Sequence, residues 1–258
     1  MADVDFTYLD GPTALLELEG LRLLTDPTFD PPGTDYPFPG YTLHKTKESP
    51  LSPAALPEID AVLLSHDHHR DNLDDAGREF AKRARSVLTT AAGATRLGSP
   101  ARGLNPGDTV TLTGRDGRSL RITATPARHG PPGGDRGPVI GFLLEPTRAD
   151  TGCVYVSGDT VWYEEVAQLA RRYPIKLAVL FLGAAKVAPA GPSHLTFTAA
   201  EAVEAARAFG DAAIIPLHFE GWAHFTESRA EISAAFAAAR LSDRLIWPEA
   251  GRPIRIAI

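Results

Sequence analysis

The chain has 258 residues, and its 26 Lys and Arg residues against 32 Asp and Glu residues give a formal net charge of −6. This acidic balance, without a long basic run, disfavours a nucleic-acid partner. No apolar stretch approaches the roughly 18 residues of a membrane span, and the first residues, Met-Ala-Asp-Val-Asp, lack the order of a signal peptide. The single cysteine, Cys153, excludes an internal disulfide framework and a cysteine-based zinc cluster. We therefore expect a cytoplasmic protein without a nucleic-acid or membrane partner.

Short apolar strands open the chain. Residues 4–9, 13–18 and 21–25 are each apolar, and the turn sequences Asp10-Gly11-Pro12 and Glu19-Gly20 separate them. Residues 26–50 follow, rich in Pro, Gly and aromatic residues and without a period of 3.6 or 2. We predict a long ordered loop there. A loop of this length often acts as a lid or a binding loop, and a proline-stiffened surface loop is the alternative.

Strands and helices alternate through the rest of the chain. The predicted strands cover residues 59–65, 86–89, 109–112, 120–125, 139–144, 154–157, 177–182, 212–217, 245–247 and 254–258, and the predicted helices cover 74–84, 161–172, 198–209 and 228–240. We predict a single domain over residues 1–258 with two similar halves, about 1–145 and 153–258. Two mixed sheets packed face to face with helices outside satisfy this order, which is an α/β (α+β) fold.

Histidine and aspartate residues follow four of the predicted strands, at the point where each strand ends. They are His66, His68, His69, Asp71, His129, Asp159 and His218. Because neighbouring strands of a sheet region end together, these loops can converge, and convergent His and carboxylate groups form a site for a divalent metal. Taken singly, each has a simpler explanation: Asp159 or Thr160, for example, is a typical N-cap for the helix predicted next. Their joint placement predicts a metal site.

Such a site predicts hydrolytic chemistry. Imidazole binds zinc, iron or manganese, and a carboxylate can bridge two ions. Two ions about 3.5–4 Å apart convert a bridging water into a hydroxide at neutral pH, which attacks an ester, a lactone or a phosphate. We expect one or two divalent ions, with zinc as the first choice and manganese or iron as alternatives.

Taken together, these segments resemble the metallo-β-lactamase fold superfamily over nearly the whole chain. The resemblance is carried by Leu-Leu-Thr-Asp-Pro at 23–27, Leu-Leu-Ser-His-Asp-His at 63–68, Ala-Arg-His-Gly at 127–130, Val-Ser-Gly-Asp-Thr at 156–160 and Ile-Pro-Leu-His at 215–218. The Thr-Asp-Pro, Arg-His-Gly and Pro-x-His segments look most like the branch that contains ascorbate-phosphate lactonases and N-acyl-phosphatidylethanolamine-hydrolysing phospholipase D. The resemblance implies a four-layer αββα sandwich with the metal site at one edge, between the sheets.

The resemblance also implies a role for each ligand by its position in the motifs. The first ion would be held by His66, by one of His68 or His69, and by His129; the second ion would be held by Asp71 and His218, with Asp159 as the bridge. Asp71 would also orient or deprotonate the attacking water, as a catalytic residue.

The histidine signature departs from the family pattern at its end. Asn72 stands where the last histidine of His-x-His-x-Asp-His would fall, and the spacing is one residue too long. His66-x-His68 fits the front half and His69-x-Asp71 fits the back half, so one of His68 and His69 points away. The second site therefore loses an imidazole. Our hypothesis is that this site is weak, or that His69 or Asp67 fills the gap.

Other residues near these motifs are candidates for catalysis or for substrate binding. His194, in a loop before a helix, could donate a proton as a catalytic residue. The predicted substrate-binding residues are Arg128, Trp162, Trp222 and His224. A surface ion pair for the arginine, core packing for the tryptophans and a packed loop for each histidine are the alternatives. Substrate choice is expected to reside in residues 26–50 and 183–198.

Three functions are compatible with the sequence. The first is a metal-dependent hydrolase that uses a metal-bound hydroxide on a small ester, lactone, amide or phosphodiester. The second is a non-hydrolytic binding or sensor protein on the same fold with a degenerate second metal site, an alternative that Asn72 keeps open. A nuclease is disfavoured by the acidic balance. We expect a lactonase-like hydrolase with a small-molecule substrate, and a homo-oligomer is compatible with the sequence.

Overall fold

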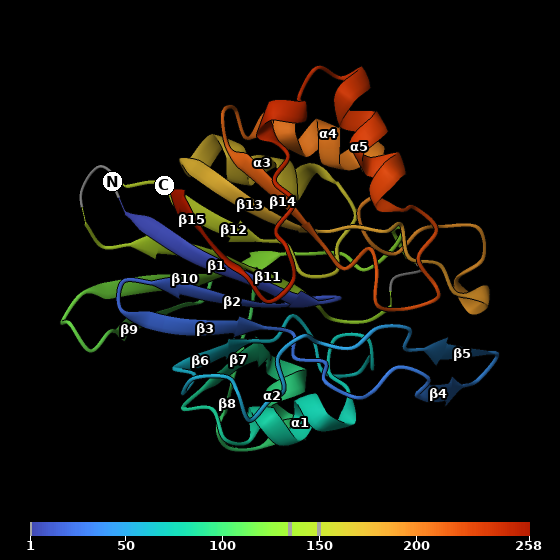
Figure 1. Cartoon of the computed structure of the whole chain (residues 1–258), viewed down its shortest axis with the longest axis horizontal. Helices are drawn as coiled ribbons and strands as arrows, with labels where there is room; N and C mark the ends of the chain where they lie inside the picture. Colours follow the sequence, from blue (N-terminus) through green and yellow to red (C-terminus); the bar gives the residue numbers. More distant parts are fainter. Residues whose placement is uncertain (1, 134–135, 149–150) are drawn as a thin grey trace.

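Two β-sheets lie face to face, with helices on both outer sides (Figure 1). The computed structural model describes residues 2–133, 136–148 and 151–258. In spatial order, the first sheet contains β15 (Pro253–Ala257), β1 (Asp3–Asp10), β2 (Thr13–Leu18), β3 (Leu21–Thr25), β6 (Ala61–Leu63), β7 (Val87–Thr90) and β8 (Ala101–Leu104). The second contains β14 (Ala213–Leu217), β13 (Ile175–Phe181), β12 (Cys153–Val156), β11 (Ile140–Pro146), β10 (Ser119–Pro126) and β9 (Thr109–Thr113).

The helices form the outer layers. Those that cover the second sheet are α3 (Glu164–Arg172), α4 (Ala199–Ala208) and α5 (Arg229–Ala238), and those that cover the first are α1 (Asp75–Ala81) and α2 (Ala91–Leu97). Two single 3-10 turns lie at Ala188–Ala190 and Ser242–Arg244. This confirms the predicted four-layer αββα sandwich. No helix in the described part of the chain is both long and apolar enough to cross a lipid bilayer.

Strands that are apolar on both faces explain why the sheets can be covered on both sides. In β12, Val154 and Val156 face the other sheet, whereas Cys153 and Tyr155 pack among the helices outside. Both sheets are mixed, as predicted: β3, β6, β7 and β8 run parallel, as do β12, β13 and β14, and the remaining pairs are antiparallel. Parallel neighbours end at one edge, so the loops that follow β6, β12 and β14 are brought close together.

Some local predictions were wrong. Residues 26–50 are not simply a loop, because β4 (Asp35–Phe38) and β5 (Tyr41–His44) form a hairpin that projects at the right of Figure 1. The helix α2 and the strand β8 were not predicted. Residues 245–247 contribute only an isolated bridge between Leu245 and Ile214. The strand β8 forms because it pairs parallel with β7, and such a tertiary partner is not visible in the local pattern.

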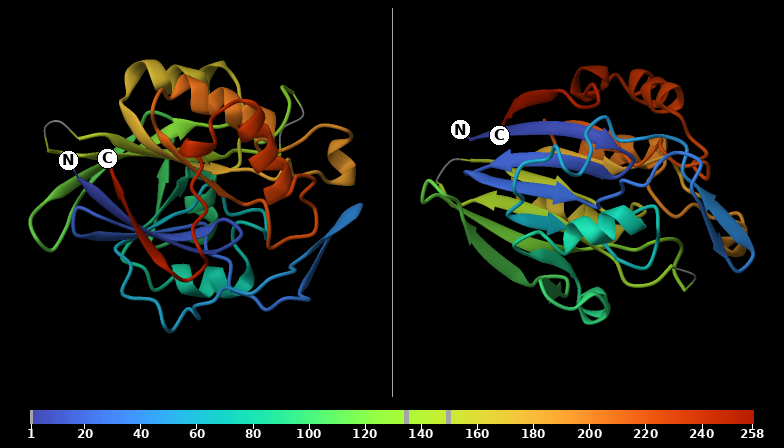
Figure 2. Two further views of the ribbon diagram at one scale, coloured as in Figure 1. Left: turned by 45° about the horizontal axis from the view of Figure 1, so that its top comes forward. Right: turned by 60° about the horizontal axis from the view of Figure 1, so that its bottom comes forward.

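The chain crosses from one sheet to the other once in its first half and returns at its last strand. The chain passes from the first sheet to the second between β8 and β9, near residue 105. Its last strand, β15, returns to pair with β1, so both termini lie at the same end of the sandwich (Figure 2). The strand β11 pairs antiparallel with β12, β10 pairs with β11, and β9 pairs with β10, so all three strands belong to the second sheet.

Candidate metal centre and its cavity

Six of the predicted ligands meet at the edge where the parallel strands end. They form two sets of three, in each of which one ligand atom per residue lies within 4.8 Å of the others: His66, His69 and His129 form the first set, and Asp71, Asp159 and His218 form the second. All six side chains are buried. The structure thus brings together groups from loops that follow four different strands.

The first set consists of imidazoles whose lone pairs converge. The Nδ1 atom of His69 lies 3.0 Å from Nε2 of His66 and 3.1 Å from Nε2 of His129. These separations are close to the ~3.3 Å that tetrahedral ligands at 2.0–2.1 Å from a zinc ion require. The Nδ1 atom of His129 donates to the carbonyl of Leu195 over 2.9 Å, which leaves its Nε2 lone pair free.

His66 is oriented by a short relay of hydrogen bonds. Its Nδ1 atom lies 2.9 Å from the hydroxyl of Ser65, and that hydroxyl donates to Oδ1 of Asp26 over 2.6 Å. The backbone amide of Ser65 donates to the same oxygen. Asp26 therefore holds the ring of His66 through Ser65. From the sequence, Asp26 was identified only as part of the Leu-Leu-Thr-Asp-Pro segment at 23–27. Its role in orienting His66 was not predicted.

The structure places His69, and not His68, in the first set. The Nε2 atom of His68 instead donates to the backbone carbonyl of Arg136 over 2.8 Å. One extra residue in the turn therefore rotates one imidazole toward the neighbouring loop. The ring of His68 stays close to that of His66, with centroids 4.7 Å apart. Closeness to His66 therefore does not distinguish His68 from His69 as the ligand.

The second set is rich in carboxylate. The Nε2 atom of His218 lies 3.5 Å from Oδ2 of Asp71 and 3.5 Å from Oδ1 of Asp159. Two buried atoms of this set, His218 Nε2 and Asp159 Oδ2, make no hydrogen bond. Buried polar atoms are rarely left without a partner, so these orphaned atoms fit a bound cation. Asp159 is free for this, because α3 begins only at Glu164 with Tyr163 as its N-cap.

Burial and charge set different protonation states in the two sets. Burial, together with the neighbouring imidazoles, lowers the pKa of His66 well below its usual value and that of His69 to about 3, so both rings are neutral. Burial also acts on His218, but Asp159 and Asp71 outweigh it and raise the pKa of His218 to about 10. A divalent cation would replace the proton that His218 otherwise holds between the carboxylates.

Neither residue proposed to replace the missing imidazole lies in the second set. Asp67 turns away and pairs with Arg96, and His69 belongs to the first set. The side chain of Asn72 is buried, and its Nδ2 atom donates to Oδ1 of Asp159 over 3.3 Å. Its Oδ1 atom has no hydrogen-bond partner. Both suggested ways of filling the gap are therefore corrected, and the hypothesis of a weak second site stays a prediction.

We expect Asn72→His to bind the second ion about 10- to 100-fold more tightly than the natural protein, since a neutral amide gives way to an imidazole ligand. Calorimetric titration of the metal-free protein, resolved into two binding steps, measures this. Asn72→Leu is the control, because it removes the amide without adding a ligand. Equal affinity of the histidine variant and the natural protein for the second ion would refute the hypothesis.

His224 lies beside the second set. Its Nε2 atom is 3.0 Å from Oδ2 of Asp71, and it shares a narrow cavity with that residue. Burial by itself would raise the pKa of Asp71, but the neighbouring imidazoles of His218 and His224 outweigh it and hold that pKa well below its usual value. His218 and His224 together therefore keep Asp71 ionised, and the contact with His224 orients its carboxylate.

The structure places four other predicted residues away from the cavity. His194 pairs with Glu201 at the start of α4. The guanidinium of Arg128 lies 4.3 Å above the ring of Tyr163, and its Nε donates to the carbonyl of Gly130. Trp162 packs outside the second sheet. Trp222 is buried among the apolar side chains behind the cavity and does not line it.

The cavity itself is small, about 20 Å³. Its lining comprises Tyr41, Leu43, His69, Asp71, His129, Arg136, Ala185, Val187, Leu195 and His224. The two segments expected to decide substrate choice, 26–50 and 183–198, thus both contribute to it. Sequence reasoning missed Tyr41 and Arg136, because neither follows a strand end and they lie 95 positions apart.

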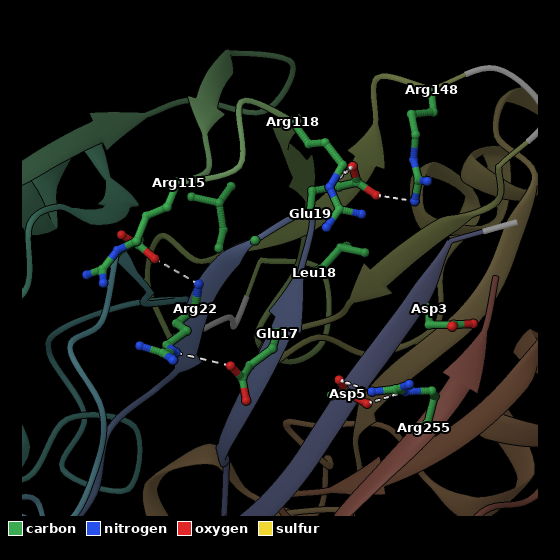
Figure 3. Close-up of a pocket in the computed structure, with 13 residues that line it drawn as sticks. Asp3, Asp5, Glu17, Leu18, Glu19, Arg22, Arg115, Arg118, Arg148 and Arg255 are labelled. Atoms are coloured by element: carbon green, nitrogen blue, oxygen red, sulfur yellow. Dashed lines mark hydrogen bonds and ion pairs between the residues drawn. The ribbon is translucent and has the colours of Figure 1, made fainter.

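A larger cavity, of about 480 Å³, lies at the opposite ends of the strands. In Figure 3, Arg118 and Arg148 lie on either side of Glu19, and Arg255 pairs with Asp5. Its lining contains five arginines and five carboxylates. Because these charges balance, and because neither ligand set lies there, we assign the chemistry to the smaller cavity.

Comparisons with known proteins agree with this fold. A family model described as a beta-lactamase superfamily domain matches residues 21–219. A metal-dependent hydrolase of Pelotomaculum thermopropionicum is 29% identical over 203 residues, which are 74% of this chain and 81% of that protein. One of Caldivirga maquilingensis is 25% identical over 209 residues, or 79% and 77% of the two chains. The crystal structure of an isothiocyanate hydrolase from Delia radicum gut bacteria has a TM-score of 0.83 and 22% identity, covering 98% of this chain and 100% of that chain.

Proposed function

Because this chain belongs to the beta-lactamase superfamily and is a metal-dependent hydrolase of that fold, we propose that it holds two divalent ions and hydrolyses a small ester, lactone, amide or phosphodiester. One observation carries the proposal. The two carboxylate oxygens of Asp159 face the two ligand sets separately: Oδ2 lies 3.5 Å from Nε2 of His129, and Oδ1 lies 3.5 Å from Nε2 of His218. From this position Asp159 would contribute one oxygen to each of the two ligand sets.

When bound, the ions would lower the pKa of a water and polarise the bond to be cleaved. The chain supplies the remaining parts. Asp71 lines the cavity with its carboxylate ionised, so it can accept a hydrogen bond from the attacking water and orient it. His224 holds that carboxylate in place. The apolar walls formed by Leu43, Val187 and Leu195 exclude bulk water.

The chemistry of the ligands also supports a proposal about the ions. Three imidazoles suit zinc, whereas two carboxylates and one imidazole suit zinc, manganese or iron. We assign zinc to the first set. A lactonase-like activity and a cytoplasmic location remain part of this proposal, as does a small-molecule substrate in place of nucleic acid or membrane.

We expect about two equivalents of metal in protein purified without chelators and without a histidine tag, measured by elemental analysis. Such protein should hydrolyse members of a panel of lactones, carboxylic esters and phosphodiesters. The activity should be lost on chelation and restored by metal. Asp159→Ala is the matched variant, which should retain about one equivalent or less. One equivalent in the natural protein would mean that Asn72 has cost the second site. None, even after metal is added back, would leave a binding protein and overturn the proposal.

A further inference from the structure

Arg136 and Tyr41 lie together on the wall of the metal cavity. A terminal nitrogen of the Arg136 guanidinium donates to the hydroxyl oxygen of Tyr41 over 2.8 Å. Both residues line the cavity that contains Asp71 and His129. They are half-buried, whereas the ligands are buried. The pair therefore lies toward the mouth, where the part of a substrate that does not react would rest.

The backbone of Arg136 is fixed by the ligand loops themselves. Its amide donates to the carbonyl of His129 over 2.8 Å, and its carbonyl accepts from Nε2 of His68 over 2.8 Å. His129 is itself a predicted metal ligand, and His68 lies in the turn between the ligands His66 and His69. The backbone of Arg136 is thus held at a set position relative to the metal centre, and the hydrogen bond to Tyr41 orients the guanidinium, as a binding group requires.

The pair offers hydrogen-bond donors. Among the residues that the structure describes, no carboxylate forms an ion pair with Arg136, and Tyr41 is the described partner of its guanidinium. Since the hydroxyl oxygen of Tyr41 accepts from Arg136, its own hydrogen is free to donate. Burial raises the pKa of Tyr41, so the hydroxyl keeps that hydrogen at neutral pH. Two bound divalent ions beside Asp71 and Asp159 would add further positive charge.

We propose that Arg136 and Tyr41 bind an oxyanion of the substrate, a carboxylate or a phosphate, and that the substrate class is a small anionic compound with an apolar body. An acceptor group with negative charge matches this set of donors. The apolar body would contact Leu43, Ala185 and Val187, which line the same cavity. This inference rests on the proposed hydrolase function. The test below distinguishes failure of the oxyanion site from failure of the hydrolase proposal.

The test compares two esters of equal length, mono-4-nitrophenyl glutarate, which is anionic, and 4-nitrophenyl valerate, which is neutral. The natural protein should favour the anionic ester in kcat/KM. In Arg136→Gln the ratio of anionic to neutral kcat/KM should fall about 10- to 100-fold, as for loss of hydrogen bonds to a charged group. Arg136→Lys should retain part of the preference for the anionic ester. Tyr41→Phe should lower the ratio of anionic to neutral kcat/KM about 2- to 10-fold. Competition by glutarate and by inorganic phosphate then shows which oxyanion is preferred.

Arg128→Gln is the matched control, because that arginine is in the same loop region and packs on Tyr163 instead. The ratio of anionic to neutral kcat/KM in Arg128→Gln should equal that of the natural protein. The metal content of every variant should also equal that of the natural protein. Turnover of both esters without a charge preference would overturn this inference and leave the hydrolase intact. If neither ester is cleaved, calorimetric titration of the metal-loaded protein with glutarate decides. Binding that is lost in Arg136→Gln supports the oxyanion site, and no binding by the natural protein refutes it.

Discussion

Replacing His69 by alanine is expected to remove the first metal site and to lower hydrolytic activity by about 100- to 1000-fold or more. The reason is that His69 Nδ1 lies within 3.1 Å of the ligand nitrogens of both His66 and His129, so its loss leaves two imidazoles where three converged. An ion at such a site contributes several kcal/mol of transition-state stabilisation. Elemental analysis and calorimetric titration with zinc measure the lost site directly, apart from activity.

His68→Ala is the control for His69→Ala. It removes a neighbouring imidazole of the same turn, whose Nε2 atom bonds to the carbonyl of Arg136 and belongs to neither ligand set. We expect it to retain both metal equivalents and to lose about 1 kcal/mol of stability from one hydrogen bond. Loss of metal in His68→Ala together with retention in His69→Ala would contradict the assignment.

Replacing Lys45 by methionine is expected to lower the free energy of unfolding by about 3–5 kcal/mol. Lys45 is 1% exposed, and its Nζ atom lies 3.4 Å from Oδ2 of Asp10 and 3.8 Å from Oδ2 of Asp74. Methionine preserves the packing of the aliphatic part of the Lys45 side chain, but it leaves the two buried carboxylates without their cation. Urea unfolding monitored by tryptophan fluorescence measures the change.

The pH dependence of this loss has a definite sign. Burial raises the pKa of Asp74 from its usual 3.8 to about 6, even with Lys45 beside it. The native state therefore binds more protons than the unfolded state between about pH 4 and pH 6, and stability falls as pH rises through that window. Without Lys45 that pKa rises further. The destabilisation of Lys45→Met should thus be larger at about pH 7.5 than at about pH 5.

Lys47→Met is the matched control for the stability prediction. Lys47 is exposed and pairs with Glu220 on the surface, so its loss should cost no more than about 1 kcal/mol. Equal losses in the two variants, or a loss in Lys45→Met that is independent of pH, would contradict the buried ion cluster. Since Lys45 directly follows β5, it also anchors the hairpin that carries Tyr41 and Leu43 to the cavity.

The fold class and most of the ligands could be predicted from the sequence because they depend on local patterns. Continuous apolar runs predict strands covered on both faces, and His or Asp directly after such a run lies at the end of a sheet. Helix starts are equally local: Thr198 and Ser228 each form a capping box with a glutamate three positions on. These features need no knowledge of distant neighbours.

Only the tertiary structure decided which side chains face the metal cavity. His68 and His69 are adjacent, and the directions of their rings are set by His129, 60 positions from His69, and by the carbonyl of Arg136, 68 positions from His68. Likewise, Arg128 was singled out because it adjoins His129, yet Arg136 is the arginine that lines the cavity. The orientation of a side chain in a loop depends on partners from other loops. Sequence spacing determines which loops meet, and packing among them determines which residue points inward.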